Sequence, residues 1–169
     1  MSRAPSAFAP EVTPWAARAI PIASIIAGSL LATVPMIATF PVLPPFGLIV
    51  LLAWRMLRAE TVPLWSPLAF GAFDDLVSGQ PLGSAMLLWT VGFLVIDLLD
   101  QRLVSRDFWL DWVLAAGSIA LSLIGGRLIA TGLAAHVDTL LLLQVVVAVL
   151  LYPFVARLVA WFDRKRGRA

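Results

Sequence analysis

Six apolar runs constrain the fold of this chain more than any other feature of its sequence. They cover approximately residues 19–40, 46–57, 64–77, 82–99, 108–130 and 139–161. Only 13% of the residues are charged, whereas soluble domains carry about 25%. Because a helix of ~20 apolar residues crosses the hydrocarbon core of a bilayer, a chain of this length has room for about six crossings and short links. The sequence therefore predicts an all-α integral membrane protein with six transmembrane helices.

Two of these runs are short for a membrane crossing. Residues 46–57 and 64–77 provide only ~12–14 residues each, fewer than an upright helix needs to cross a ~30 Å hydrocarbon core. We expect either that the bilayer is thinner around these helices or that other helices of the bundle shield them from lipid.

Lysine and arginine are distributed asymmetrically around the runs. With the N-terminus in the cytoplasm, eleven of the twelve basic residues fall on the cytoplasmic side, and only Arg127 lies toward the other side. An excess of Lys and Arg in cytoplasmic segments is the main determinant of orientation. We therefore predict a multi-pass protein with both termini in the cytoplasm. It divides into an N-terminal tail at 1–18, a six-helix membrane domain at 19–161 and a basic tail at 162–169 that also contacts anionic lipid.

Several classes of function are excluded or disfavoured by the residue types present. The sequence contains no cysteine, which excludes disulfides and thiolate chemistry. Its single histidine, His136, lies in a short link, and no serine–histidine or glycine-rich phosphate-binding motif is recognisable. The basic residues lie at the ends of the runs, as membrane topology requires, rather than in a nucleic-acid-binding patch. We therefore expect no catalytic residue, no metal, no cofactor and no nucleic-acid partner.

The stretch AFGAFDDLVSGQPLG, residues 69–83, places two adjacent carboxylates in an apolar environment. An ionised side chain costs at least roughly 2.5 kcal/mol in a membrane helix, so a retained acid needs a partner or a function. Pro67, Gly71 and Asp75 recur every fourth residue, share one helix face, and leave little side-chain bulk on it, so a second helix can approach closely. We expect Asp75 to lie against that helix and to accept hydrogen bonds from its amide or hydroxyl groups. Asp74 points ~100° away, toward a different neighbour.

The residues that follow Asp75 indicate a tight turn between two helices. Gly79 lies on the same face as Asp75 and supplies conformational freedom, Pro81 gives the next helix a rigid start, and Gly83 allows its backbone to approach closely. The sequence therefore predicts a closely packed helix–turn–helix corner held by one buried acid.

The other charged residues within the runs have simpler expected roles. Asp97 and Asp100 can pair with Arg102 and Arg106 at the cytoplasmic surface. Arg127 follows a Gly-Gly pair and could line a cavity or bind a lipid headgroup, but a side chain that extends to the membrane surface is the favoured interpretation.

Residues from about 44 to 112 resemble the core of the MreD family, the bacterial rod shape-determining membrane proteins. That family has an apolar second span that enters a Trp- or Tyr-containing segment, here around Trp54. A Gly-x-x-x-Asp-Leu-x-x-Gly-x-x-Leu-Gly corner then follows, and this chain matches it at Gly71, Asp75, Leu76, Gly79, Leu82 and Gly83. The chain length, the six-span layout and the basic C-terminal tail extend the resemblance over the whole chain.

The resemblance implies a fold, a role and a set of partners. The fold would be a compact bundle similar to the membrane-embedded S components of energy-coupling-factor transporters. The role would be non-enzymatic, in the bacterial inner (plasma) membrane, within the complex that organises lateral peptidoglycan synthesis and cell shape. MreC would be the direct membrane partner, with MreB, RodA and the elongation transpeptidase in the same complex. The corner would be a structural and partner-assembly motif, formed by Gly71, Asp75, Gly79, Leu82 and Gly83.

Two functions from different classes stay open at this point. The first is a scaffold that holds the transmembrane helix of a single-span partner, which the large apolar area and the short links favour. The second is a membrane module that resembles an S component and binds a small molecule. It would need a cavity open to the outside and lined by polar groups near Asp75, Gln80 and Arg127. An intramembrane enzyme is disfavoured, because no assembled set of catalytic residues is recognisable.

Overall fold

A computed structural model describes residues 14–31, 43–102, 107–131 and 139–166, without the side chains of 14–18 and 166. Within these ranges every regular element is helical, as predicted. The elements are α1 (Pro14–Leu31), α3 (Phe46–Leu57), the 3-10 helix η1 (Ala59–Thr61), α4 (Ser66–Ser78), α5 (Ser84–Asp100), α6 (Phe108–Ala130) and α7 (Thr139–Arg166).

Two helices have the predicted bounds and two differ from them clearly. Helices α3 and α6 begin and end at the expected residues, since Pro45 and Asp107 stand just before them at positions that suit the start of a helix. Helix α1 begins earlier than expected, at Pro14, and its expected end at Phe40 lies outside the described residues. Helix α7 continues past the expected end at Trp161 to Arg166, and Pro153 lies inside it.

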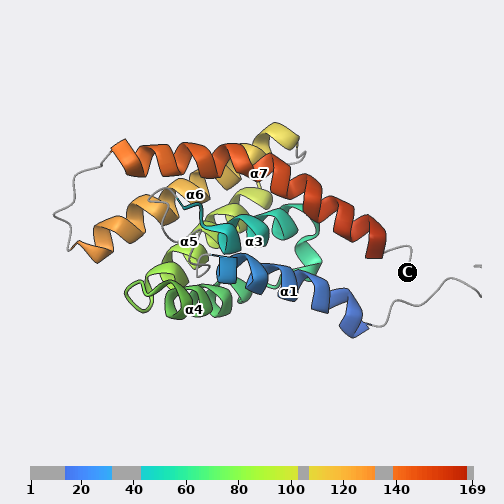
Figure 1. The fold of residues 1–169 in the computed structure, drawn as a ribbon. Coiled ribbons are helices and arrows are strands. Elements are labelled where there is room, and N and C mark those ends of the chain that lie inside the picture. Colours follow the sequence, from blue (N-terminus) through green and yellow to red (C-terminus); the bar gives the residue numbers. More distant parts are fainter. Residues whose placement is uncertain (1–13, 32–42, 103–106, 132–138, 167–169) are drawn as a thin grey trace, which may run out of the picture.

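The helices form a closed circle of neighbours around one apolar core. Contacts join α1 to α3, α3 to α7, α7 to α6, α6 to α5, α5 to α4 and α4 back to α1. Helices α6 and α7 lie along one side of the bundle and α1 and α4 along the opposite side, with α3 and α5 between them (Figure 1). The start of α1 and the end of α7 lie at the same end of the bundle, at the right of Figure 1.

Helix α3 is the central element. Residues 47–49 and 51–55 are buried, and several of the largest fully buried side chains of the described residues, including Trp54, belong to this helix. Other helices therefore shield most of this short run, which is the second of the two arrangements expected for it. Helix α4 is less buried than α3. Its buried residues, which lie on one face, are Ser66, Pro67, Gly71 and Asp75.

Two helices of the described chain are long and apolar enough to cross a membrane without help from others. They are Phe108–Ala130 and Thr139–Lys165, and only 11% of the most apolar 18-residue window of each is buried inside the bundle. Their outward faces carry leucine, valine and phenylalanine side chains, among them Val113, Leu142 and Phe154. Such surfaces are expected where lipid, rather than water, surrounds the helices.

Candidate functional site

The predicted small-residue face of α4 lies against the start of α5. Gly71 is buried there, and a Cβ atom added to it would lie 2.6 Å from Met86 Cα, 2.7 Å from Met86 N and 2.9 Å from the carbonyl carbon of Ala85. All three atoms belong to the backbone of α5, so no side-chain rotation can relieve the clash. Only glycine allows α4 and α5 to approach this closely.

Asp75, four residues further along the same face, caps the N-terminus of α5. The side chain is 1% exposed. Its Oδ1 accepts hydrogen bonds from Ala85 N at 2.9 Å and from Ser84 Oγ at 3.0 Å, and its Oδ2 accepts one from Gly83 N at 2.9 Å. Met86 N lies at 3.4 Å from Oδ2.

The geometry explains why an acid is stable at this position. The first amides of a helix have no acceptor within the helix, and the positive end of the helix dipole favours a carboxylate nearby. The N-cap residue of α5, Gly83, has no side chain that could accept a hydrogen bond from these amides. A residue from the preceding helix therefore does what a local cap would do, and Asp75 joins α4 to α5 through hydrogen bonds to amide and hydroxyl donors, as expected from the sequence.

The turn between the two helices depends on two glycines. Gly79, the C-cap of α4, has φ +69°, and Gly83, the N-cap of α5, has φ +95°. Both values lie in the left-handed region, which favours glycine. Leu82 lies between them and is 76% exposed, and Leu76 is 69% exposed. These two leucines therefore make little contact with the rest of the described chain and face the surroundings of the bundle.

Asp74, the other acid of the pair, points into a polar cavity instead. One cavity of about 230 Å³ is lined by residues that include Asp74, Gln80, Ser122, Arg127 and Gln144. A second cavity of about 340 Å³ shares Asp74, Gln80 and Gln144 with the first and extends to Ser29. We call these adjoining spaces the polar cavity. They lie at the end of the bundle where α4 turns into α5, opposite to the end where α1 begins (Figure 1).

Most of this cavity could not be predicted from the sequence. Arg127 lines it, which was one of the alternatives considered for this residue; its side chain is also exposed, so the favoured interpretation, extension to the membrane surface, stays a prediction. Gln144 also lines it, and its Nε2 donates a hydrogen bond to the carbonyl oxygen of Leu43, just before α3. A lone glutamine within an apolar run is the signal that was available for it.

The opposite end of the bundle holds ion pairs between α3 and α5 that were not expected from the sequence. Asp97 and Asp100 pair with Arg55 of α3, at 2.9 and 3.6 Å, and not with Arg102 as expected; Arg106 lies outside the described residues. The side chain of Arg55 is only 9% exposed. Its partners are 42 and 45 positions away in the sequence, so only the tertiary fold brings the three residues together.

A second ion pair joins the same region to the last helix. Arg58 Nε lies 2.8 Å from Asp163 Oδ2, and Asp163 is 10% exposed at its side chain. Asp163 lies beyond the predicted end of the last span, in the extension of α7. The two arginines at the end of α3 therefore connect α3 to α5 and to α7.

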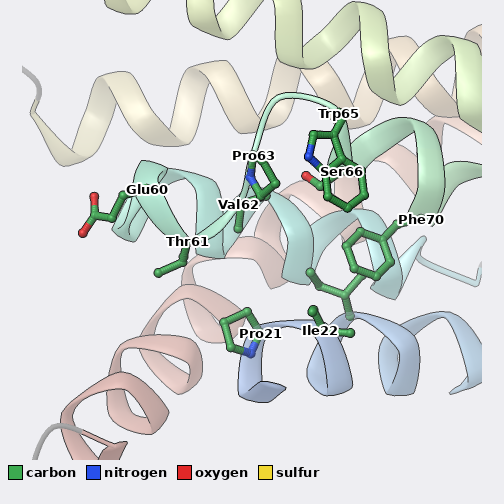
Figure 2. A pocket seen from close by; sticks show the side chains of 10 residues that line it. Pro21, Ile22, Glu60, Thr61, Val62, Pro63, Trp65, Ser66 and Phe70 are labelled. Atoms are coloured by element: carbon green, nitrogen blue, oxygen red, sulfur yellow. The ribbon is translucent and has the colours of Figure 1, made fainter. Parts of the chain in front are cut away.

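An apolar groove lies between α1 and the start of α4. It has a volume of about 270 Å³, and its lining includes Pro21, Ile22, Val62, Trp65 and Phe70. Figure 2 shows Phe70 of α4 directed toward Ile22 of α1, while Glu60 lies at the far edge of the groove. Trp65 is 67% exposed, so a large aromatic side chain stands at the mouth of the groove.

Metal chemistry has no support in the residues that the structure describes. No group of three or more His, Asp or Glu side chains comes together there in a way that would hold a metal ion. His136 lies outside these residues.

Comparison with known proteins gives one match. The model of a family described as rod shape-determining protein MreD matches residues 17–162. No curated protein matches the chain. No solved structure matches it either.

Proposed function

Because the chain belongs to the rod shape-determining protein MreD family, we propose that it acts as a non-catalytic membrane scaffold that binds MreC. The family determines rod cell shape and consists of membrane proteins. In this proposal the chain also belongs to a complex with MreB, RodA and the elongation transpeptidase that organises lateral peptidoglycan synthesis. The observation that carries the proposal is the family match over residues 17–162.

The arrangement of charged groups supports a scaffold. Arg55, Asp75 and Asp163 are buried, and each contacts a group on another helix. Buried charges that cross-link helices fix the geometry of a bundle. A fixed bundle can present a defined apolar surface to the transmembrane helix of another protein.

We propose the apolar groove between α1 and α4 as the surface that holds the partner helix. An apolar groove can bind a helix whose apolar side chains recur every three or four residues and so lie on one face. Ile22 and Trp65, which line the groove, remain 45% and 67% exposed. Of the corner residues, Gly71, Asp75, Gly79 and Gly83 would act in assembly by fixing the position of α4, which forms one wall of this groove. The exposed Leu82 would act by contacting a partner directly.

The proposal also places the chain in the bacterial inner membrane with six crossings and both termini in the cytoplasm. The start of α1 and the end of α7 lie at the same end of the bundle, which supports the placement of both termini on one side of the membrane (Figure 1). The basic residues Arg55, Arg58 and Lys165 at that end support it as well. The proposed division is a tail at 1–18, a membrane domain at 19–161 and a tail at 162–169, the last beginning within α7.

Co-purification of MreC with the tagged chain in a mild detergent tests the scaffold. We expect the two proteins to elute together in a constant ratio. Ile22→Trp places a larger side chain in the groove and should weaken the binding of MreC. We expect roughly tenfold less retained MreC, which corresponds to a loss of about 1.4 kcal/mol of binding free energy. Leu142→Trp, at a similarly exposed position on α7, should retain MreC as the wild type does. Wild-type chain that elutes without MreC would contradict the scaffold, and full retention by Ile22→Trp would contradict the groove.

The polar cavity favours a second candidate function, the membrane module that binds a small molecule. Its lining brings together Gln80 and Arg127, two of the residues expected near such a cavity, with Asp74 in place of Asp75. The test is the identification of a small molecule that remains bound to the purified chain. The two functions are compatible, because the groove and the cavity share no lining residue.

A further inference from the structure

The polar cavity contains charged groups of both signs. Asp74 places a carboxylate where the two adjoining spaces meet, and Arg127 places a guanidinium on the wall of the smaller one. Asp74 is half-buried and Arg127 is exposed, so the negative group lies deeper than the positive group. Ionisable residues that face a cavity within a membrane bundle are candidates for a functional site.

The lining also contains neutral polar side chains, and hydrogen bonds to neighbouring residues hold two of them in place. Ser122 Oγ accepts a hydrogen bond from Trp89 Nε1 at 3.1 Å, which leaves the hydroxyl proton available to an acceptor. The hydrogen bond from Gln144 Nε2 to Leu43 O holds that amide at the cavity wall. Gln80 contributes another amide from the turn between α4 and α5. A ligand of this cavity therefore meets hydrogen-bond donors and acceptors in addition to the two charged groups.

The size of the cavity limits the ligand. The two volumes, about 230 and 340 Å³, lie just below and just above the lower limit of the ~300–1,000 Å³ found for small-molecule sites. A carboxylate in a half-buried position favours an ammonium group, while a guanidinium forms paired hydrogen bonds with a phosphate or a carboxylate.

We propose that the polar cavity binds a small zwitterion, with its ammonium group on Asp74 and its anionic group on Arg127. This inference rests on the second proposed function and names the ligand class. Two sources supply this chemistry, namely the headgroup of an aminophospholipid from the surrounding membrane and a free zwitterion such as phosphoethanolamine. Either source reaches the cavity at the end of the bundle that bears Arg127.

Two measurements on the full-length chain in detergent test the proposal. Native mass spectrometry detects retained phosphatidylethanolamine, and calorimetric titration with phosphoethanolamine measures binding of the free headgroup. We expect binding in at least one measurement. Asp74→Asn and Arg127→Gln should each weaken it at least tenfold, whereas Glu60→Gln and Arg164→Gln, the same charge changes at the opposite end of the bundle, should leave it unchanged. Arg127 is exposed, so we expect its variant to fold, which keeps the test decisive if Asp74→Asn does not fold.

Each outcome decides a separate point. Retained phosphatidylethanolamine without binding of phosphoethanolamine supports the lipid source, and the reverse supports the free zwitterion. Binding that is unaffected in both cavity variants would overturn the proposed site. Retention of an uncharged molecule would overturn the ligand class but preserve the binding module. A cavity that holds water only would overturn both, while MreC co-purification would still report independently on the scaffold.

Discussion

Gly71→Leu is expected to prevent the chain from accumulating as a folded membrane protein. Even the Cβ atom of the new side chain would lie within 3 Å of three backbone atoms of α5, and the rest of the leucine would force α4 and α5 apart. Overpacking of a well-packed site costs about 1–3 kcal/mol, and separating the helices would also break the hydrogen bonds of Asp75. The measurement is the amount of monodisperse protein in fluorescence-detected gel filtration.

Glycine-to-alanine substitutions distinguish the effect of the close helix contact on stability from the effect of helix propensity. Alanine is a better helix former than glycine by about 1 kcal/mol, so propensity alone would make Gly71→Ala stabilising. We expect the opposite, a lower melting temperature, because the clash involves the α5 backbone. Gly117→Ala on α6 is the matched control, since a Cβ there meets nothing within 4 Å, and it should raise the melting temperature slightly. Equal melting temperatures for Gly71→Ala and the wild type would contradict the close contact.

Asp75→Ala is expected to destabilise the corner by at least about 3 kcal/mol, because several buried donors of α5 lose a charged acceptor at once. Asp75→Asn should be more stable than Asp75→Ala but less stable than the wild type. The two carboxylate oxygens now accept hydrogen bonds from Gly83 N and Ala85 N, and an asparagine would place an NH2 group opposite one of these donors. The melting temperature in detergent and the level of membrane-inserted protein measure the effect.

The control for this series is Asp107→Asn at the start of α6. Asp107 is exposed and makes no capping hydrogen bond through its side chain, and Asn and Asp are equivalent at such positions. We expect no change in melting temperature for this variant. A wild-type melting temperature for Asp75→Ala would show that the corner does not depend on the acid.

The acidic pair shows what sequence periodicity can predict. The recurrence of Pro67, Gly71 and Asp75 every four residues was sufficient to place these residues on one buried face, because helix geometry is local. The same geometry predicted that Asp74 points elsewhere, but not that it lines a cavity. A cavity is formed by several helices, and nothing in the sequence around Asp74 specifies which of them meet there.

Ion pairs between distant helices were beyond the reach of the sequence for the same reason. Arg55 has acidic partners on α5, whereas the arginine closest to those acids in sequence, Arg102, was the obvious choice. The length of α7 was also underestimated, because the basic residues that normally end a span continue the helix here to Arg166. Bounds set by local signals, such as Pro45 before α3, were predicted correctly.

Cross-linking from single cysteines tests most directly whether the bundle holds the helix of a partner. The chain has no native cysteine, so each position reports alone. Suitable exposed positions are Ile22 in the groove, Val95 on α5 and Leu150 on α7. We predict a cross-link to MreC from Ile22→Cys in intact membranes and little from the other two. The absence of a cross-link from all three positions, in cells that express the chain and remain rod-shaped, would contradict the scaffold.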